Sequence, residues 1–151
     1  MRQFANLDEL KGAVGQVLGE GEWFTMTQDV IDKFAEATGD FQYIHVDPVK
    51  AKDGPFGTTI AHGFLTLSLV PTLGRSVYRV GGIATGINYG SNRIRFIEPV
   101  RVNSRIRSKV KLVAVEPHPP GRRITTEITV EIEGAAKPAL VAEILSLMIP
   151  A

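Results

Sequence analysis

The chain has 151 residues, of which 44% are hydrophobic and 22% are charged. This size and composition predict one globular domain, residues 1–151, and exclude a disordered chain. The formal net charge of +1 gives no electrostatic basis for binding nucleic acid or an acidic membrane surface. No cysteine is present, which excludes a disulfide scaffold, a thiol nucleophile and cysteine-ligated metal sites.

The N-terminal residues mix acidic and apolar side chains and lack the basic and apolar regions of a signal peptide. The longest apolar stretch, residues 60–73, is shorter than the roughly 20 residues that span a bilayer. We therefore expect no membrane span and a cytoplasmic protein.

Two helices are predicted in the first half of the chain. The first covers residues 27–39, because Thr27 can cap its N-terminus and Gly39 is a natural left-handed stop. A loop rich in proline and glycine is expected at residues 40–59. The second helix, residues 61–73, is apolar on all sides, so it should be buried on most of them. Pro71 should end or kink its last turn.

The second half of the chain alternates between apolar and polar residues, which predicts strands with one solvated face. The predicted strands cover residues 91–97, 105–112, 124–132 and 139–149. One apolar helix combined with an antiparallel sheet indicates the α+β class. The sheet should wrap around the helix, because nothing else in the chain is large enough to cover it.

A basic stripe runs along residues 105–111, and its partner strand suggests what it does. If Pro119 lies at the centre of the hairpin, three pairs of opposite charge face each other. These pairs are Arg105–Glu133, Arg107–Glu131 and Lys111–Glu127. We therefore interpret the stripe as a solvated sheet face neutralised by its neighbour, and not as a phosphate or nucleic-acid site.

The candidate catalytic groups are few, because the chain has only three histidines and no cysteine. Asp40 and His45 lie in the expected loop, where a chain folded back on itself can bring them together as an acid–base pair. The alternative is a helix-terminal aspartate beside an unrelated surface histidine. His118 lies in the proline-rich turn and is expected to be exposed and inert.

His62 and Gly63 open the predicted central helix, and two interpretations of them stay open. The first N–H groups of a helix lack internal acceptors, so they can bind a developing oxyanion if a carbonyl group reaches them. Glycine leaves room for that approach. Close packing of the helix against a neighbour would equally require a glycine.

A family resemblance adds to these patterns. The run from Phe34 to Asp40, followed by Ile44-His45 and by Ala51, resembles the signature of the MaoC-like (R)-specific enoyl-CoA hydratases, or hydratase 2. Residues 61–65 resemble the start of the central helix of that family, and residues 95–100 resemble the strand that follows. The similarity spans roughly residues 20–150, with the motifs in the same order.

The resemblance implies a single hot-dog domain, in which an antiparallel sheet curls around one long buried helix, and a homodimer with acyl-CoA near the subunit interface. The implied reaction is the reversible addition of water to a trans-2-enoyl-CoA, giving the (R)-3-hydroxyacyl-CoA. Asp40 and His45 would be the catalytic pair, and the Gly63 N–H would bind the thioester oxygen. No metal or separate cofactor is expected, since coenzyme A is part of the substrate.

The chain departs from the family pattern beside the catalytic pair. The family usually has Asn-Pro where this chain has Gln42 and Tyr43. We expect these two residues and His62 to contact the substrate, and the exchange to affect chain-length preference or rate. Two alternative functions stay open, which are a hot-dog acyl-CoA thioesterase and a non-catalytic acyl-CoA-binding or partner subunit. The candidates for binding the CoA phosphates are Arg75, Arg79, Arg93 and Arg95.

Overall fold

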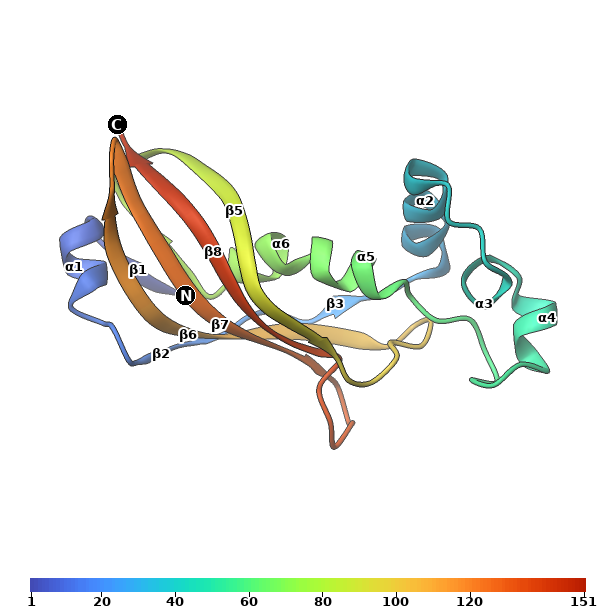
Figure 1. Cartoon of the computed structure of the whole chain (residues 1–151). Coiled ribbons are helices and arrows are strands. Elements are labelled where there is room, and N and C mark those ends of the chain that lie inside the picture. The colour runs from blue at the N-terminus through green and yellow to red at the C-terminus, as the bar shows by residue number, and fades with distance from the viewer.

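The computed structural model describes all of residues 1–151, and its main feature is a strongly curved antiparallel sheet (Figure 1). The strand order is β2-β6-β7-β8-β5, with β3 pairing to β6. These strands are β2 (Val17–Glu20), β3 (Phe24–Thr25), β5 (Ile83–Phe96), β6 (Arg105–His118), β7 (Gly121–Ile132) and β8 (Leu140–Pro150). A second, small sheet pairs β1 (Arg2–Phe4) with β4 (Tyr78–Val80) in parallel. The α+β class and the antiparallel sheet are thus as predicted.

The hairpin β6–β7 has the predicted register. Lys111 lies opposite Glu127 and Arg107 opposite Glu131. Arg105 and Glu133 form an ion pair just outside the paired region, which completes the predicted set. The register shifts by one residue after Leu112, nearer the turn. The other face of β6 is buried, as the alternation predicted, through Ile106, Ser108, Val110 and Leu112.

The central helix runs along the concave side of the sheet in two pieces, α5 (Gly63–Ser68) and α6 (Val70–Gly74) (Figure 1). The break at Leu69 lies two residues before Pro71, whose ring and missing N–H interrupt the helix as predicted. The expectation that this helix is buried on most sides needs correction. Leu65, Val70 and Leu73 are buried, but Phe64 on another side is 67% exposed in the single chain.

The helices within residues 28–52 lie beyond one end of the sheet (Figure 1). Helix α2 (Gln28–Thr38) has the predicted ends, because the Thr27 side chain accepts a hydrogen bond from the Val30 N–H and Gly39 has a φ of 78°. The expected loop at 40–59 is wrong in part, since it contains two short helices, α3 (Tyr43–Val46) and α4 (Pro48–Lys52). Pro48 begins α4, a position at which its missing N–H has no cost.

The N-terminal segment contributes α1 (Leu7–Lys11), which packs its buried Leu7 and Leu10 into the core. That core is one cluster of 23 buried apolar residues between the helices and the concave face of the sheet. No helix of the structure is both long and apolar enough to cross a membrane. The start of α5 meets α2 and α3 at the end of this core, and the predicted site residues gather there.

Candidate active site

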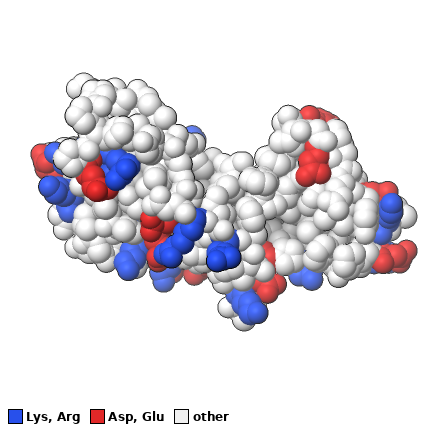
Figure 2. Space-filling model, in the orientation of Figure 1, with Lys and Arg blue, Asp and Glu red and all other residues white.

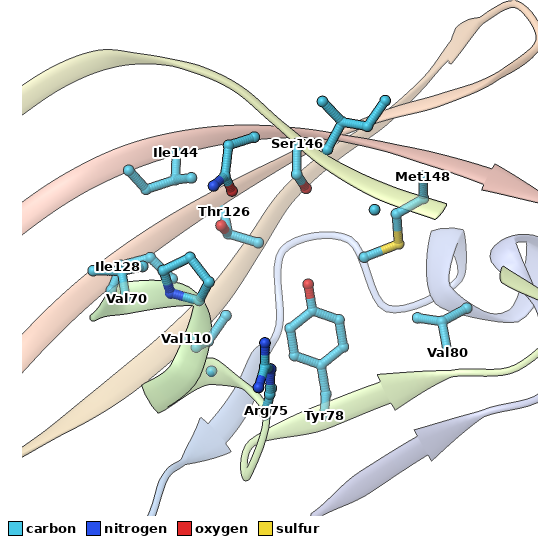
Figure 3. A pocket seen from close by; sticks show the side chains of 15 residues that line it. Val70, Arg75, Tyr78, Val80, Val110, Thr126, Ile128, Ile144, Ser146 and Met148 are labelled. Carbon is cyan, nitrogen blue, oxygen red and sulfur yellow. The ribbon is translucent and has the colours of Figure 1, made fainter. Parts of the chain in front are cut away.

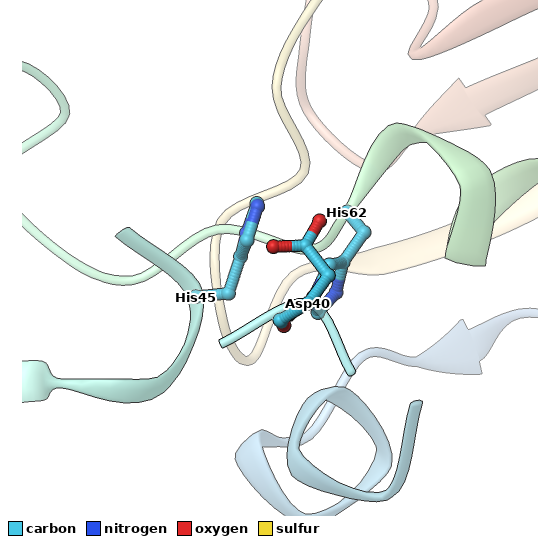
Figure 4. A group of neighbouring side chains, drawn as sticks. All are labelled: Asp40, His45 and His62. Carbon is cyan, nitrogen blue, oxygen red and sulfur yellow. The ribbon is translucent and has the colours of Figure 1, made fainter. Parts of the chain in front are cut away.

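Asp40, His45 and His62 come together from three separate elements (Figure 4). Asp40 follows the end of α2, His45 lies on α3, and His62 directly precedes α5. One side-chain N or O atom from each lies within 4.8 Å of those of the other two. The folded-back chain that the Asp40–His45 spacing required is therefore present.

His45 is held by hydrogen bonds at both ends. Its Nδ1 lies 2.7 Å from the Ile60 carbonyl oxygen. A carbonyl can only accept, so Nδ1 carries the proton and Nε2 keeps a free lone pair. The backbone carbonyl of His45 accepts a hydrogen bond of 2.7 Å from the Gln28 side chain, and Gln28 in turn accepts one from Thr59. Sequence reasoning missed Gln28, because nothing in a helix pattern marks a residue that will brace a distant histidine.

The environment of His45 favours its neutral form. The side chain is 6% exposed, and this burial is the main cause that lowers its pKa from the usual 6.5. The nearby His62 lowers the pKa further, whereas the Ile60 carbonyl and Asp40 oppose the shift. His45 is thus a neutral imidazole at physiological pH, and its free Nε2 can take a proton.

His62 supports both members of the pair. Its ring stacks on that of His45, with centroids 3.8 Å apart, and packs against Phe34 on another side. His62 Nε2 donates to the Asp40 backbone carbonyl over 3.0 Å, while its buried Nδ1 has no hydrogen-bond partner. These contacts fix the His45 ring and the backbone of Asp40 together.

The other residues that we expected to contact substrate lie to one side. Gln42 caps α3 and donates its backbone N–H to the exposed Asp40 side chain. Tyr43 packs beneath the Lys50 ammonium group, 4.5 Å from the ring centroid. Neither lines the cavity that His45 borders, and Asp40 and His62 lie beside His45 without lining it themselves.

That cavity has a volume of about 270 Å³ and is mostly apolar. His45 and Gly63 both line it, together with Thr66 and Phe96. The N–H of Gly63 has no backbone acceptor, and the His62 side chain does not cap it. A Cβ at position 63 would lie 3.1 Å from the Phe96 ring. The close-packing interpretation of Gly63 is therefore confirmed, whereas the binding of an oxyanion by its unbonded N–H stays a prediction.

The three side chains have the donor types of a metal site, but their arrangement favours hydrogen bonding. A metal ion lies in the plane of each imidazole that binds it. The rings of His45 and His62 are stacked with only 24° between their planes, so their in-plane lone pairs run side by side.

Comparison with known proteins identifies the family. Residues 9–135 match the family described as MaoC like domain. A protein of Mycobacterium tuberculosis named 3-hydroxyacyl-thioester dehydratase Z is 51% identical over 144 residues, covering 95% of each chain. Nodulation protein N of Rhizobium leguminosarum is 42% identical, covering 95% of this chain and 91% of its own.

A solved structure has the same fold. It is an R-hydratase, PhaJ1, of Pseudomonas aeruginosa, with a TM-score of 0.77 at 24% identity, covering 98% of this chain and 88% of the other. The sheet that curls around α5 and α6 is accordingly the hot-dog fold expected from the resemblance. With the match over residues 9–135, this shows that the chain belongs to the MaoC-like domain family.

Proposed function

We propose that this chain, a hydro-lyase of the dehydratase type, adds water reversibly to a trans-2-enoyl thioester and gives the (R)-3-hydroxyacyl thioester. One observation carries the proposal. His45, with a free Nε2 beside Asp40, and the unpaired N–H of Gly63 border the same apolar cavity. An acid–base group and an oxyanion donor at one cavity are what this reaction needs, and Asp40 lies beside His45 to complete the pair. The dehydratase name of the Mycobacterium tuberculosis relative is consistent with it.

In the proposed mechanism, Asp40 and His45 hold the water molecule and act as one unit. The water oxygen forms a bond to the β-carbon while its proton passes to the pair. The pair then returns a proton to the α-carbon, so the sum of the step is the addition of one water molecule. The neutral state of His45 suits this role, because only a neutral imidazole can accept the first proton.

Electrons move onto the thioester oxygen as the water adds. The N–H of Gly63 would hold that oxygen and stabilise the enolate, helped by the partial positive charge at the start of a helix. A preorganised donor of this kind contributes about 3–4 kcal/mol to transition-state binding. The thioester carbonyl would therefore point at Gly63, with the β-carbon toward Asp40 and His45.

The free edge of the sheet supports the homodimer that the resemblance implies. Strand β5 pairs only with β8 along its 14 residues. Large apolar side chains are exposed there, including Ile87 and Tyr89. Phe96, near the end of β5, contacts the exposed Phe64 beside Gly63. Charged residues are sparse on the hollowed upper face of the view, whereas they gather on the lower side (Figure 2). A second copy that covers β5 would also close the site.

The first experiment follows the enoyl thioester absorbance and the release of free thiol, with crotonyl-CoA and a longer 2-enoyl-CoA as substrates. We expect loss of the enoyl thioester absorbance without release of thiol, and oxidation of the product only by an (R)-specific dehydrogenase. Release of thiol would instead support a thioesterase. The absence of activity on both substrates from the folded homo-oligomer would support a binding or partner subunit.

Analytical ultracentrifugation tests the proposed dimer, which Ile87→Lys should weaken.

A further inference from the structure

A second cavity lies at the other end of the central helix, away from the catalytic pair (Figure 3). Its volume is about 320 Å³. Val70, Ile128 and Met148 give it apolar walls, as an acyl chain would require. Five polar side chains also line it, one from the residue after α6 and one each from β4, β5, β7 and β8. These are Arg75, which directly follows α6, Tyr78, Asn88, Thr126 and Ser146.

The polar groups of this cavity lack partners within the chain. Arg75 forms no ion pair, although six salt bridges occur elsewhere. Burial raises the pKa of Tyr78, so its hydroxyl stays protonated and can donate a hydrogen bond. The Tyr78 and Ser146 hydroxyls point toward the middle of the cavity (Figure 3). Thr126 is buried, and Tyr78 and Ser146 are partly buried, whereas Arg75 and Asn88 are exposed. Buried donors without acceptors are costly, so a ligand that supplies acceptors to this cavity would be favoured.

An intermediate hollow adjoins the far cavity, with which it shares Val70, Asn88 and Ile144, and it lies between that cavity and the site along the central helix. Gly63 and Thr66 line the catalytic cavity, Leu67 and Ser68 line the hollow, and Gly74 lines the far cavity. Strand β5 follows the same order on the opposite wall, with Phe96, then Ile94, then Ile87. The path follows the helix for about 16 Å, from the rise of about 1.5 Å per residue.

We propose that this far cavity binds a carboxylate at the distal end of the acyl chain, so that the preferred substrates are 2-enoyl thioesters with a terminal carboxyl group. The inference rests on the proposed hydratase function. All five polar side chains can donate hydrogen bonds, and a carboxylate only accepts them. Arg75 supplies the opposite charge, and this role replaces the contact with a CoA phosphate for which the sequence offered Arg75 as a candidate. A terminal methyl group would displace water from these donors and give nothing back, which a site of this kind rejects strongly.

The test compares terminal-carboxyl and terminal-methyl 2-enoyl-CoA substrates of matched length, from short to long. We expect kcat/KM to favour the carboxyl form by at least about tenfold at the length that spans the path, as for other charge-assisted recognition. Arg75→Gln should abolish most of that preference. Tyr78→Phe, which removes only one oxygen atom, should reduce it while leaving crotonyl-CoA turnover unchanged.

The controls separate this inference from the hydratase proposal. Arg79→Gln removes the same charge four residues later, outside the cavity, and should leave the preference intact. Crotonyl-CoA is too short to reach Arg75, so its turnover tests the hydratase function alone. If crotonyl-CoA is hydrated but terminal-methyl or terminal-hydroxyl substrates are preferred at every length, the carboxylate site is wrong. The same conclusion follows if neither Arg75→Gln nor Tyr78→Phe changes the ratio.

Discussion

The hairpin β6–β7 and the segment from Asp40 to Gly63 use their polar residues in opposite ways. On the hairpin, charged side chains neutralise one another on a solvated face, as Arg107 does with Glu131 and Glu20. In the 40–63 segment, the imidazoles of His45 and His62 are bonded to backbone carbonyls, and each keeps a ring nitrogen that makes no bond within the chain. Paired charges contribute to structure, whereas a held group with a free atom is available for chemistry.

The largest expected effect comes from the proposed catalytic pair. Asp40→Asn and His45→Gln should each lower kcat at least about a hundredfold, the usual scale for a positioned acid or base. The fold should survive, because Asp40 is exposed and the core lies elsewhere. Steady-state kinetics on crotonyl-CoA measure kcat, and circular dichroism measures whether the variant is folded. His118→Gln at the far hairpin turn is the control; the His118 ring is half-buried against Tyr89, and not exposed as predicted, but it lies far from the pair. A folded variant of either residue with near-normal kcat would contradict the assignment.

Gly63 gives the next largest effect. In Gly63→Ala the new Cβ would meet the Phe96 ring at 3.1 Å, so the ring or the start of α5 must move. Because the proposed oxyanion donor would move with the helix, we expect kcat to fall about tenfold or more, toward the cost of losing such a donor. Gly74→Ala, on the same helix run and in open space, is the control. Adding Phe96→Leu should restore part of the activity if crowding is the cause.

The pH dependence follows from the burial of His45. Its pKa is lowered in the folded chain, so the acid limb of kcat/KM should fall below the ordinary histidine value of 6.5. The lowered pKa of His45 also makes the free energy of unfolding depend on pH. As the pH falls below about 6.5, the unfolded chain takes up a proton that the folded His45 resists, and stability is lost through that window. Denaturant unfolding from pH 7.5 to 5 should be less pH-dependent in His45→Gln. An equally steep loss in that variant would assign the effect to another group.

The smallest effect is expected on the hairpin. Glu131→Lys places a like charge against Arg107 in a partly exposed pair, which should cost at most about 1 kcal/mol. For a chain of this size that lowers the melting temperature by about 2–4 °C. Glu127→Lys should cost less, because Glu127 faces Lys111 without forming an ion pair. Catalytic activity should not change in either variant. An unaltered melting temperature for Glu131→Lys would show that the pair is not stabilising.

The hairpin was the more predictable of the two regions. Alternation predicted its buried face, and opposite charges predicted its register, because both signals are local and repeat along a strand. The one-residue shift after Leu112 was not predictable, since a bulge leaves no mark in the alternation. In the site segment, the loop expected at 40–59 contains α3 and α4, two helices too short for a periodic pattern to reveal.

The sequence by itself determined the elements whose causes are local, which are the caps of α2, the break before Pro71 and the paired faces of β6 and β7. Its motifs also indicated the family and pointed to Asp40, His45 and Gly63. Only the tertiary structure decided which side chains from separate elements are in contact. It stacked His62 on His45, braced His45 through Gln28, and brought five polar side chains from separate elements to one cavity. Contacts between residues far apart along the chain depend on how the sheet curls around the helix, and no local pattern encodes that curvature.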